Sequence, residues 1–398
     1  MLVLAHRIRL DLNDVQETWF ERCAGAARFV WNWGLARWQE MREANAKPNW
    51  RKLNAELNAR KRTDLGWISA IPWKVANTAL EDLGGAFQHF FRRVKAGEKP
   101  GYPNFKKKGR SKPSFSIEGR ALGLDGKRLR IPKLGWVRMC EALRLPGRVL
   151  SVRFTKCAGH WYASFQVEVD ESRWSPRRCE TQAAVGVDLG VVDLAVLPDG
   201  ERIEAPRVLR AMEPRLRCLG RQLSRRKRGG ANWRKTVARL QSLHERIANV
   251  RAAVTHDLTA RLVRDYRYVG IEHLSVAGMA RGRLAKSVMD AALAEVRRQL
   301  EYKGQLAGCT VVVAGRWFPS SKRCSSCGHV VEVLPLSVRH WTCPKCNYEH
   351  DRDVNAARNL QQLAEAHSVT ACGEGSAGVI HDAKLPSSKQ EPGICCVH

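Results

Sequence analysis

The stretch from Val185 to Leu197, VGVDLGVVDLAVL, constrains this chain more than any other, because an acidic side chain interrupts an apolar, β-branched run. In a strand, alternate side chains share a face, so Asp188 lies with Gly186 and Gly190 while the valines pack on the other face. A buried carboxylate needs a proton, a hydrogen bond, a salt bridge or a cation. The flanking glycines leave room for a ligand or metal. Asp188 is therefore either a functional acid or a strand-end residue paired with an arginine.

The charge balance limits what this chain can bind. Its 68 Lys and Arg against 39 Asp and Glu give a formal net charge of +29, which favours a polyanionic partner, nucleic acid first and an anionic membrane surface second. No apolar run approaches the roughly 18 residues that a membrane-spanning helix needs, and no secretory signal is visible. The 13 cysteines without an export signal predict a reducing cytoplasm, where spaced cysteines bind metals more often than they form disulfides.

The first 170 residues combine a helical and a β pattern. Apolar residues recur every three or four positions from Phe20 to Trp38 and again after Trp73, so residues 11 to about 98 are predicted to form a helical unit with an aromatic core. Short alternating runs from 113 to 170 predict an antiparallel sheet or small barrel. If the strand predicted for residues 2–10 joins that sheet, the helical unit is an insertion into a β domain.

Two basic segments are candidates for nucleic-acid contacts. In KPGYPNFKKKGRSKPSFSI, aromatic residues alternate with charges, a pattern that favours a nucleic-acid surface over a solvated loop. Between Pro206 and Lys235, eleven Arg or Lys stand against one acid, above leucines at helical spacing, which predicts a helical hairpin with a basic face. The candidate contact residues are Lys106, Lys107, Lys108 and Arg110 in the first segment and Arg225, Arg226, Lys227 and Arg228 in the second.

The strand pattern returns in the second half of the chain. YVGIEHL places Gly270 and Glu272 on one face of a short strand and repeats the arrangement around Asp188. A helix from about 284 to 306 and a strand at 310–314 are predicted to follow, and the polar tail is expected to be disordered from about residue 370. Three cysteines in that tail have no assignable role: Cys372, Cys395 and Cys396.

Two CxxC pairs separated by fifteen residues form the strongest local motif: Cys324 and Cys327, then Cys343 and Cys346. Zn²⁺ takes four thiolates in a tetrahedron, and each CxxC turn supplies two of them. Gly328 and Asn347 follow the two pairs and tolerate the positive φ of such turns. The spacing predicts a closed, structural zinc site. The nearby histidines are not expected to be ligands: His329, His340 and His350.

The segment HDRDVNAARNL follows the second pair and begins a predicted helix. Asp351 is expected to cap that helix, whereas Asp353 can point into the same cleft as the strand residues. Asp188, Glu272 and Asp353 are thus three acids at the edges of apolar elements. If they converge, divalent cations must offset their repulsion, and two Mg²⁺ or Mn²⁺ ions about 3.5 to 4 Å apart would suit phosphodiester hydrolysis.

The ordered series of these segments resembles the transposon-encoded TnpB (OrfB) proteins, the compact relatives of type V CRISPR effectors. The resemblance covers residues 1 to about 370 and rests on HRIRL, PGYPNFKKKGR, VGVDLG, GIEHLSVAGM, FPSSKRCSSCG and CPKCNYEHDRDVNAARNL. It implies an α/β fold with all-β and all-α parts: an RNase H-like (RuvC) nuclease domain with a zinc-ribbon insert, and a β-barrel wedge domain interrupted by a helical recognition domain.

The resemblance also implies domain bounds and site residues. The expected parts are a wedge domain (1–10 and 113–180), a recognition domain (11–112), a RuvC-like domain (181–315 and 350–369), a zinc insert (316–349) and a disordered tail (370–398). On the family's pattern, Asp188, Glu272 and Asp353 fall on the catalytic positions and hold Mg²⁺ or Mn²⁺. Two positions depart from it: Val192 stands where relatives often carry Lys, and His273 follows Glu272 where Asp is common.

The implied function is an RNA-guided DNA endonuclease of the cytoplasm and nucleoid. Its expected partners are a guide RNA from the transposon end and a double-stranded DNA target beside a short motif. Two alternatives stay open. A transposase that joins DNA ends uses the same acids and metals, so the local chemistry does not separate it from a nuclease. A non-catalytic, zinc-containing nucleic-acid binder gains weight if the three acids do not converge.

Overall fold

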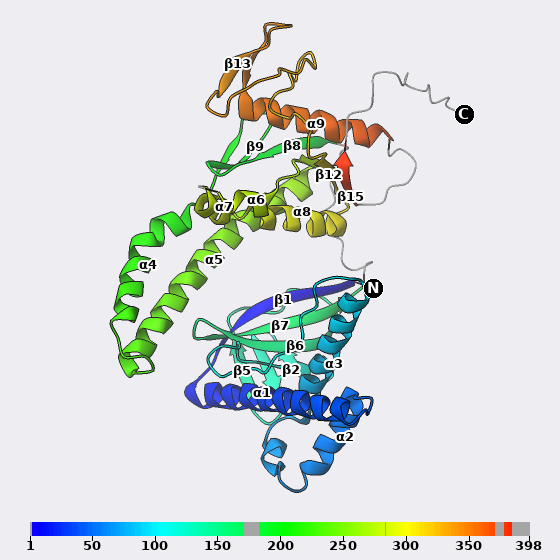
Figure 1. Cartoon of the computed structure of the whole chain (residues 1–398), viewed down its shortest axis with the longest axis vertical. Helices are drawn as coiled ribbons and strands as arrows, with labels where there is room; N and C mark the ends of the chain where they lie inside the picture. The colour runs from blue at the N-terminus through cyan, green and yellow to red at the C-terminus, as the bar shows by residue number, and fades with distance from the viewer. Residues whose placement is uncertain (1, 171–182, 283, 371–377, 384–398) are drawn as a thin grey trace, which may run out of the picture. The chain divides into compact units, whose positions relative to one another are not determined.

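The structure, a computed structural model, describes residues 2–170, 183–282, 284–370 and 378–383. The chain forms two compact units, Met1–Trp174 and Ser175–His398 (Figure 1). No helix within the described ranges is both long and apolar enough to cross a membrane.

The first unit contains seven strands, three α-helices and two 3-10 turns among its described residues. In chain order they are β1 (Leu2–Asp11), α1 (Asp14–Glu43), α2 (Trp50–Arg60), η1 (Gly66–Ala70), α3 (Trp73–Lys95), β2 (Ser114–Glu118), η2 (Gly119–Ala121), β3 (Gly123–Asp125), β4 (Arg128–Ile131), β5 (Gly135–Met139), β6 (Arg148–Cys157) and β7 (His160–Val169).

These seven strands form one antiparallel sheet in the order β2-β6-β7-β1-β5-β4-β3. β1 pairs with β7 along most of its length, so the N-terminal strand joins the sheet as predicted, and α1 to α3 lie between β1 and β2 in the chain. The sheet has two edges, β2 and β3, so strand pairing within residues 2–170 does not close it into the predicted barrel.

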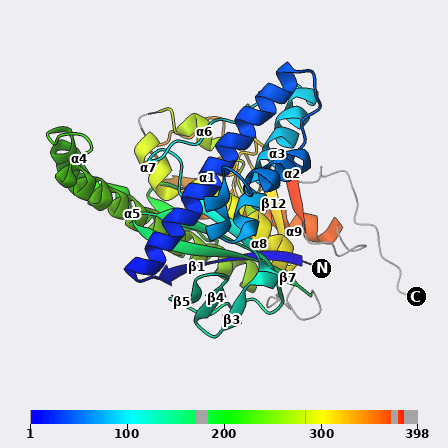
Figure 2. The ribbon, with the colours of Figure 1, turned by 90° about the horizontal axis from the view of Figure 1, so that it is seen from below.

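One core joins the helices to this sheet. α1 packs against α3 (Figure 2), and both helices contact β2. The ring of Phe20 in α1 lies edge-to-face against Phe115, Phe154 and Trp161, with ring centroids 5.1 to 5.3 Å apart. Phe20, Trp31 and Trp38 of α1 therefore belong to the core, as predicted. Asn13 caps this helix: its side chain accepts a hydrogen bond from the backbone N of Gln16 at 2.9 Å.

The second unit combines a six-stranded sheet, six helices and a separate two-stranded hairpin in its described residues. In chain order its elements are β8 (Ala184–Leu189), β9 (Asp193–Val196), β10 (Arg202–Glu204), α4 (Val208–Ser224), α5 (Ala231–Asp265), β11 (Tyr268–Ile271), α6 (Val276–Met279), α7 (Ala285–Ala291), α8 (Leu293–Ala307), β12 (Thr310–Ala314), β13 (His340–Thr342), β14 (Glu349–Asp351), α9 (Arg352–Thr370) and β15 (Val379–Ala383).

The main sheet of this unit has the strand order β10-β9-β8-β11-β12-β15. β10, β9 and β8 are antiparallel neighbours, whereas β8, β11, β12 and β15 run parallel. Parallel neighbours need crossover connections, and here the α4–α5 hairpin and the α6–α8 segment supply them. α4 and α5 pack side by side, and the far end of this hairpin extends away from the sheet (Figures 1 and 2).

Helices cover both faces of the sheet. Val185, Val187 and Leu189 pack with α5 and α8 in one core cluster, as the alternation of the strand predicts. α9 covers the opposite face and contacts β8 and β11. A Cβ atom on Gly186 would lie 1.9 Å from the backbone O of Ala357 in α9. The expectation that this glycine leaves room for a ligand or metal is therefore wrong: the helix backbone fills the space.

Three sequence expectations differ from the structure. The stretch 185–197 is a hairpin, β8 and β9, because Gly190 turns the chain where a Cβ would lie 2.7 Å from the O of Asp193. The helix predicted from 284 to 306 is broken into α7 and α8 at Ala292, whose φ is 55°. Residues 379–383 form β15 within the tail expected to be disordered, and most of that tail, including Cys372, Cys395 and Cys396, lies outside the described residues.

Candidate functional site

Two of the three predicted acids stand at the same edge of the sheet. β8 and β11 are parallel neighbours, with Gly270 opposite Gly186 and Ile271 opposite Val187. Glu272 directly follows β11, so this register brings it beside Asp188 near the end of β8. The carboxyl ends of parallel strands thus bring together two acids that lie far apart in the sequence.

Glu272 and Asp353 both act on the pKa of Asp188, so the three acids are neighbours. Burial raises the pKa of Asp188 well above its usual range. The carboxylates of Glu272 and Asp353 raise this pKa further, because a like charge nearby disfavours ionisation. Arg352 and Arg339 act in the opposite direction. A buried carboxylate with two acidic neighbours is a site that a divalent cation would stabilise.

Glu272 is held by Ser320, which shortly precedes the first CxxC pair. Its carboxylate accepts a hydrogen bond from the hydroxyl of Ser320, a buried residue. Burial raises the pKa of Glu272, and this hydrogen bond and Arg352 lower it. His273, the next residue, points its ring toward Asp382 near the carboxyl end of β15, with Nδ1 3.8 Å from Oδ1.

Asp353 lies in the first turn of α9, where two arginines bind its carboxylate. Oδ1 is 3.2 Å from Nη1 of Arg339, and Oδ2 is 3.3 Å from Nη1 of Arg202. Asp351 caps the helix, since its Oδ1 accepts hydrogen bonds from the backbone N of Asp353 and of Val354, both at 3.0 Å. The predicted cap is therefore confirmed, and Asp353 stays available for interactions across the sheet edge.

The three acids are neighbours rather than a tight cluster. Among the described residues, the one group of three or more His, Cys, Asp or Glu whose ligand atoms all lie within 4.8 Å of one another is the cysteine cluster. Mutual repulsion keeps carboxylates apart, and the carboxylate of Asp353 is paired with Arg202 and Arg339.

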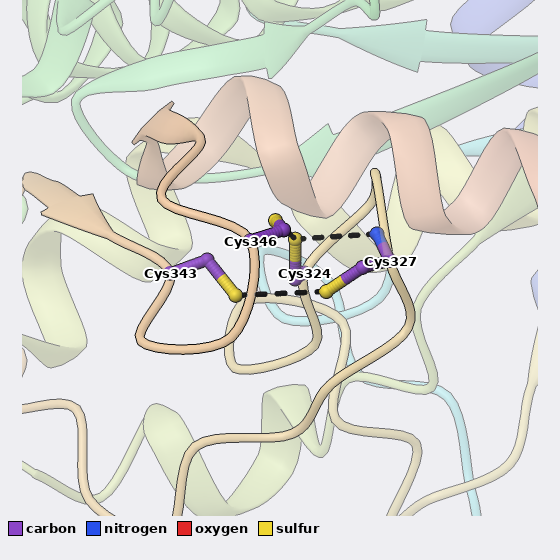
Figure 3. A group of neighbouring side chains, drawn as sticks. All are labelled: Cys324, Cys327, Cys343 and Cys346. Carbon is purple, nitrogen blue, oxygen red and sulfur yellow. Dashed lines mark hydrogen bonds between the residues drawn. The ribbon is translucent and has the colours of Figure 1, made fainter.

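The four cysteines of the CxxC pairs form that cluster: Cys324, Cys327, Cys343 and Cys346 (Figure 3). The Sγ atoms of Cys324 and Cys346 are 3.6 Å apart, as are those of Cys327 and Cys343. A zinc tetrahedron with Zn–S bonds of about 2.3 Å has edges of about 3.8 Å, so the sulfur positions fit the ion. Four soft thiolate donors in this arrangement could therefore bind zinc.

The two turns that carry the cysteines are built alike. The backbone N of Gly328 bonds to the O of Cys324, and that of Asn347 bonds to the O of Cys343, both at 2.9 Å. φ is 76° at Gly328 and 56° at Asn347. The prediction that these two residues adopt positive φ is confirmed.

Sequence reasoning missed the side chains that connect the turn of the first CxxC pair to α9. Asn355 and Asn359 are buried on this helix, and each donates from Nδ2 to the backbone O of Arg323, at 2.8 and 2.6 Å. The signal was present: asparagine is a poor helix former, and two of them at a spacing of four on an apolar face indicate buried hydrogen bonds.

The basic loop of the first unit is fastened to α1. Asn32 exchanges two hydrogen bonds with the backbone of Lys106, at 2.8 and 2.9 Å. The ammonium of Lys106 lies 3.6 Å from the centre of the Trp31 ring, and burial lowers its pKa. The neighbouring cations are exposed to solvent: Lys107, Lys108 and Arg110.

The basic turn between α4 and α5 shows the same division. Arg226 bends back onto α5, where it donates to the backbone O of Asn232 at 2.7 Å and to the hydroxyl of Thr236. Three cations of this turn stay exposed: Arg225, Lys227 and Arg228. Of the four candidate contact residues in each basic segment, one thus holds the local fold and three face solvent.

Three family models match the chain. A "Cas12f1-like, TNB domain" model matches residues 294–360, the OrfB_IS605 model described as "Probable transposase" matches 164–283, and a "Helix-turn-helix domain" model of the same family matches 1–47. The last of these covers β1 and α1, so these residues are a strand and one helix.

Relatives match over almost the whole chain. A "Putative RNA-guided DNA endonuclease InsQ" of Escherichia coli (strain K12) is 33% identical over 93% of this chain and 94% of its own length. A "Putative RNA-guided DNA endonuclease" of Streptomyces pristinaespiralis is 35% identical over 98% and 96%. The solved structure "Cryo-EM structure of the Cas12f1-sgRNA-target DNA complex" has a similar fold, with a TM-score of 0.51 at 16% identity over 88% of this chain and 83% of that one.

Proposed function

Because the chain belongs to the transposon-encoded TnpB (OrfB) family, we propose that it is an RNA-guided DNA endonuclease. The names of its relatives support the activity, and the observation that carries it is the proximity of Glu272 and Asp353 to the buried carboxylate of Asp188. The excess of positive charge supplies the attraction to RNA and DNA that such an enzyme needs.

The second unit would supply the nuclease. Three antiparallel strands followed by parallel strands, in the order β10-β9-β8-β11-β12, support an RNase H-like (RuvC) domain at 181–315 and 350–369 with the zinc insert at 316–349. In the first unit, the sheet of β1 to β7 and the helices α1 to α3 support a wedge domain (1–10 and 113–180) and a recognition domain (11–112).

Asp188, Glu272 and Asp353 would hold the catalytic Mg²⁺ or Mn²⁺. Two such ions, when bound, would activate water and stabilise the leaving oxygen of a phosphodiester. The chain's own groups prepare this site: Ser320 orients Glu272, and Arg352 offsets part of the negative charge. Carboxylate oxygens are the ligands these hard cations prefer, so the donor set fits them.

The exposed cations of the two basic segments would contact phosphates of a guide RNA and a double-stranded DNA target. A guide RNA read by base pairing removes the need for the protein to recognise the target sequence itself. Lys107, Lys108 and Arg110 support this role, because their ammonium and guanidinium groups are exposed in a loop that α1 holds in place.

The first test is to express the protein with its native flanking DNA and sequence the RNA that copurifies with it. A discrete species whose 3′ end runs past the transposon boundary supports the proposal and predicts the target. The purified complex should then cut that target in Mg²⁺, and Asp188→Ala should abolish cutting while RNA and DNA binding persist. A smear of host RNA, or products in which DNA ends are joined rather than cut, would contradict the proposal.

A further inference from the structure

The guanidinium of Arg202 forms ion pairs with three acids at the candidate site. Its Nη1 atom lies 2.8 Å from Oδ2 of Asp193 and 3.3 Å from Oδ2 of Asp353, and its Nη2 atom lies 2.8 Å from Oδ2 of Asp351. One guanidinium therefore joins three carboxylates that come from β9, β14 and α9. A planar fork with five donors can span such a set, whereas an ammonium cannot.

The three partners of Arg202 connect the sheet to the start of α9. β10 carries Arg202 and pairs with β9, which in turn pairs with β8, the strand of Asp188. Asp351 caps α9 and Asp353 lies in its first turn. Arg202 therefore fastens the first turn of the helix to the sheet that bears Asp188.

Arg339 offers a comparison within the same site. Within the described part of the chain, Asp353 is the one acid that forms an ion pair with it, at 3.2 Å, and 58% of its side chain is exposed, against 37% for Arg202. Exposed single ion pairs contribute little, because water screens the charges and holding long side chains costs entropy. Arg202 thus joins several acids at the start of α9, whereas Arg339 is a more exposed partner of Asp353.

We propose that Arg202 is a positioning residue, which fixes the start of α9 so that the Asp353 carboxylate stays beside Asp188. This inference rests on the proposed nuclease function. Arg202 contacts no reacting atom in this role; it acts through Asp351 and Asp353. Its loss leaves α9 attached through its packing on β8 and β11 but frees the first turn to move.

The test compares four variants of the full chain, each purified with its guide RNA: Arg202→Ala, Arg202→Lys, Arg339→Ala and Asp353→Ala. Cleavage is measured over a series of Mg²⁺ and target concentrations. Arg202→Ala should lower kcat about tenfold or more at saturating Mg²⁺, because a displacement of about 1 Å is costly for catalysis. Arg202→Lys should lower it similarly, whereas Arg339→Ala should stay within about threefold of the wild type. The KM for target should be unchanged in each.

Asp193→Asn is the matched control, since it removes the charge of one partner of Arg202 and leaves both contacts to the start of α9. It should cleave at the wild-type rate. Wild-type kcat in Arg202→Ala, beside an inactive Asp353→Ala, would refute the positioning role and leave the nuclease proposal intact. Normal cleavage by Asp353→Ala would refute the proposed site itself. Recovery of Arg202→Ala at high Mg²⁺, or a matching loss of zinc and thermal stability, would also refute positioning, because Arg202 would then act on metal affinity or on the fold.

Discussion

The Nε2 atom of His350 lies 3.1 Å from the Sγ atom of Cys324. His350 is buried between the rings of Trp341 and Tyr348, and its Nδ1 atom has no hydrogen-bond partner among the described residues. An unpaired Nδ1 fits the tautomer that carries its proton on Nε2 and donates it to the sulfur. With zinc on the four cysteines, this hydrogen bond would support the thiolate of Cys324.

Replacing His350 should weaken zinc binding. His350→Ala removes the donor to Cys324, and the loss of such a supporting hydrogen bond costs roughly 10- to 100-fold in metal affinity. The measurement is the zinc retained against chelators of increasing strength. His350→Gln, whose amide can donate from a similar position, should recover part of the affinity, and the exposed His340→Ala should leave it unchanged. Equal zinc retention in all variants would contradict the role of His350.

Neutralising Asp188 should stabilise the protein when divalent cations are absent. Burial, Glu272 and Asp353 raise the pKa of Asp188, so the fold favours the protonated acid and loses stability as pH rises through that pKa. Asp188→Asn removes this loss and should raise Tm by roughly 3 °C in EDTA at pH 8. The gain should shrink toward pH 4, where the native acid is protonated. A lower Tm for the variant at pH 8 would mean that the carboxylate is stabilised in the fold.

Removing the hydroxyl of Ser320 should shift the pH dependence of cleavage. This hydroxyl donates to Glu272 and lowers its pKa, so Ser320→Ala should raise that pKa and leave less carboxylate ionised at a given pH. The acid limb of the cleavage rate should therefore move to higher pH. Ser326→Ala, at an exposed position nearby, is the control and should keep the wild-type profile.

An alanine at Gly186 should disturb the contact between α9 and the sheet. The new Cβ would lie 1.9 Å from the O of Ala357, so the helix must move, at a cost of about 1–3 kcal/mol. Thermal unfolding should show a lower Tm. Gly220→Ala in α4 is the matched control: no atom lies within 4 Å of its added Cβ, and alanine favours a helix by about 0.5–1 kcal/mol, so Tm should rise.

Exposed and packed cations of the basic loop should differ in their effect on nucleic-acid binding. Replacing Lys107, Lys108 and Arg110 by alanine should lower the slope of log K against log salt by about 0.9 for each lost contact to duplex DNA. Lys106→Ala removes the contact with Trp31 and should lower Tm with little change in that slope. Equal slopes in both variants would place the binding surface elsewhere.

Local chemistry was predictable from the sequence where neighbouring residues determine it. The alternation around Asp188, the positive φ of Gly328 and the capping role of Asp351 each depend on a few adjacent residues, and all three expectations are confirmed. The zinc cluster was predictable because the CxxC spacing itself dictates which sulfurs share a turn.

Long-range partners were beyond the reach of sequence patterns. Nothing beside Arg202 in the sequence indicates that its guanidinium meets Asp351 and Asp353, about 150 positions later; only the order of the strands brings them together. The break at Ala292 was equally hidden, because alanine favours a continuous helix and packing overrides that preference. β15 lies in a polar tail whose composition does not predict a strand; its pairing with β12 stabilises the strand.

The position of α9 in the chain gives the molecule a built-in order of assembly on the ribosome. Asp188 and Glu272 emerge first, and the third carboxylate of the proposed site follows only after the zinc hairpin has been made. Glu272 and Asp353 are 81 positions apart, so at about 5–20 residues per second this delay is on the order of four to sixteen seconds. A nascent or truncated chain that ends between Glu272 and Asp353 already carries the exposed cations of both basic segments. Such a chain would hold nucleic acid without being able to cut it.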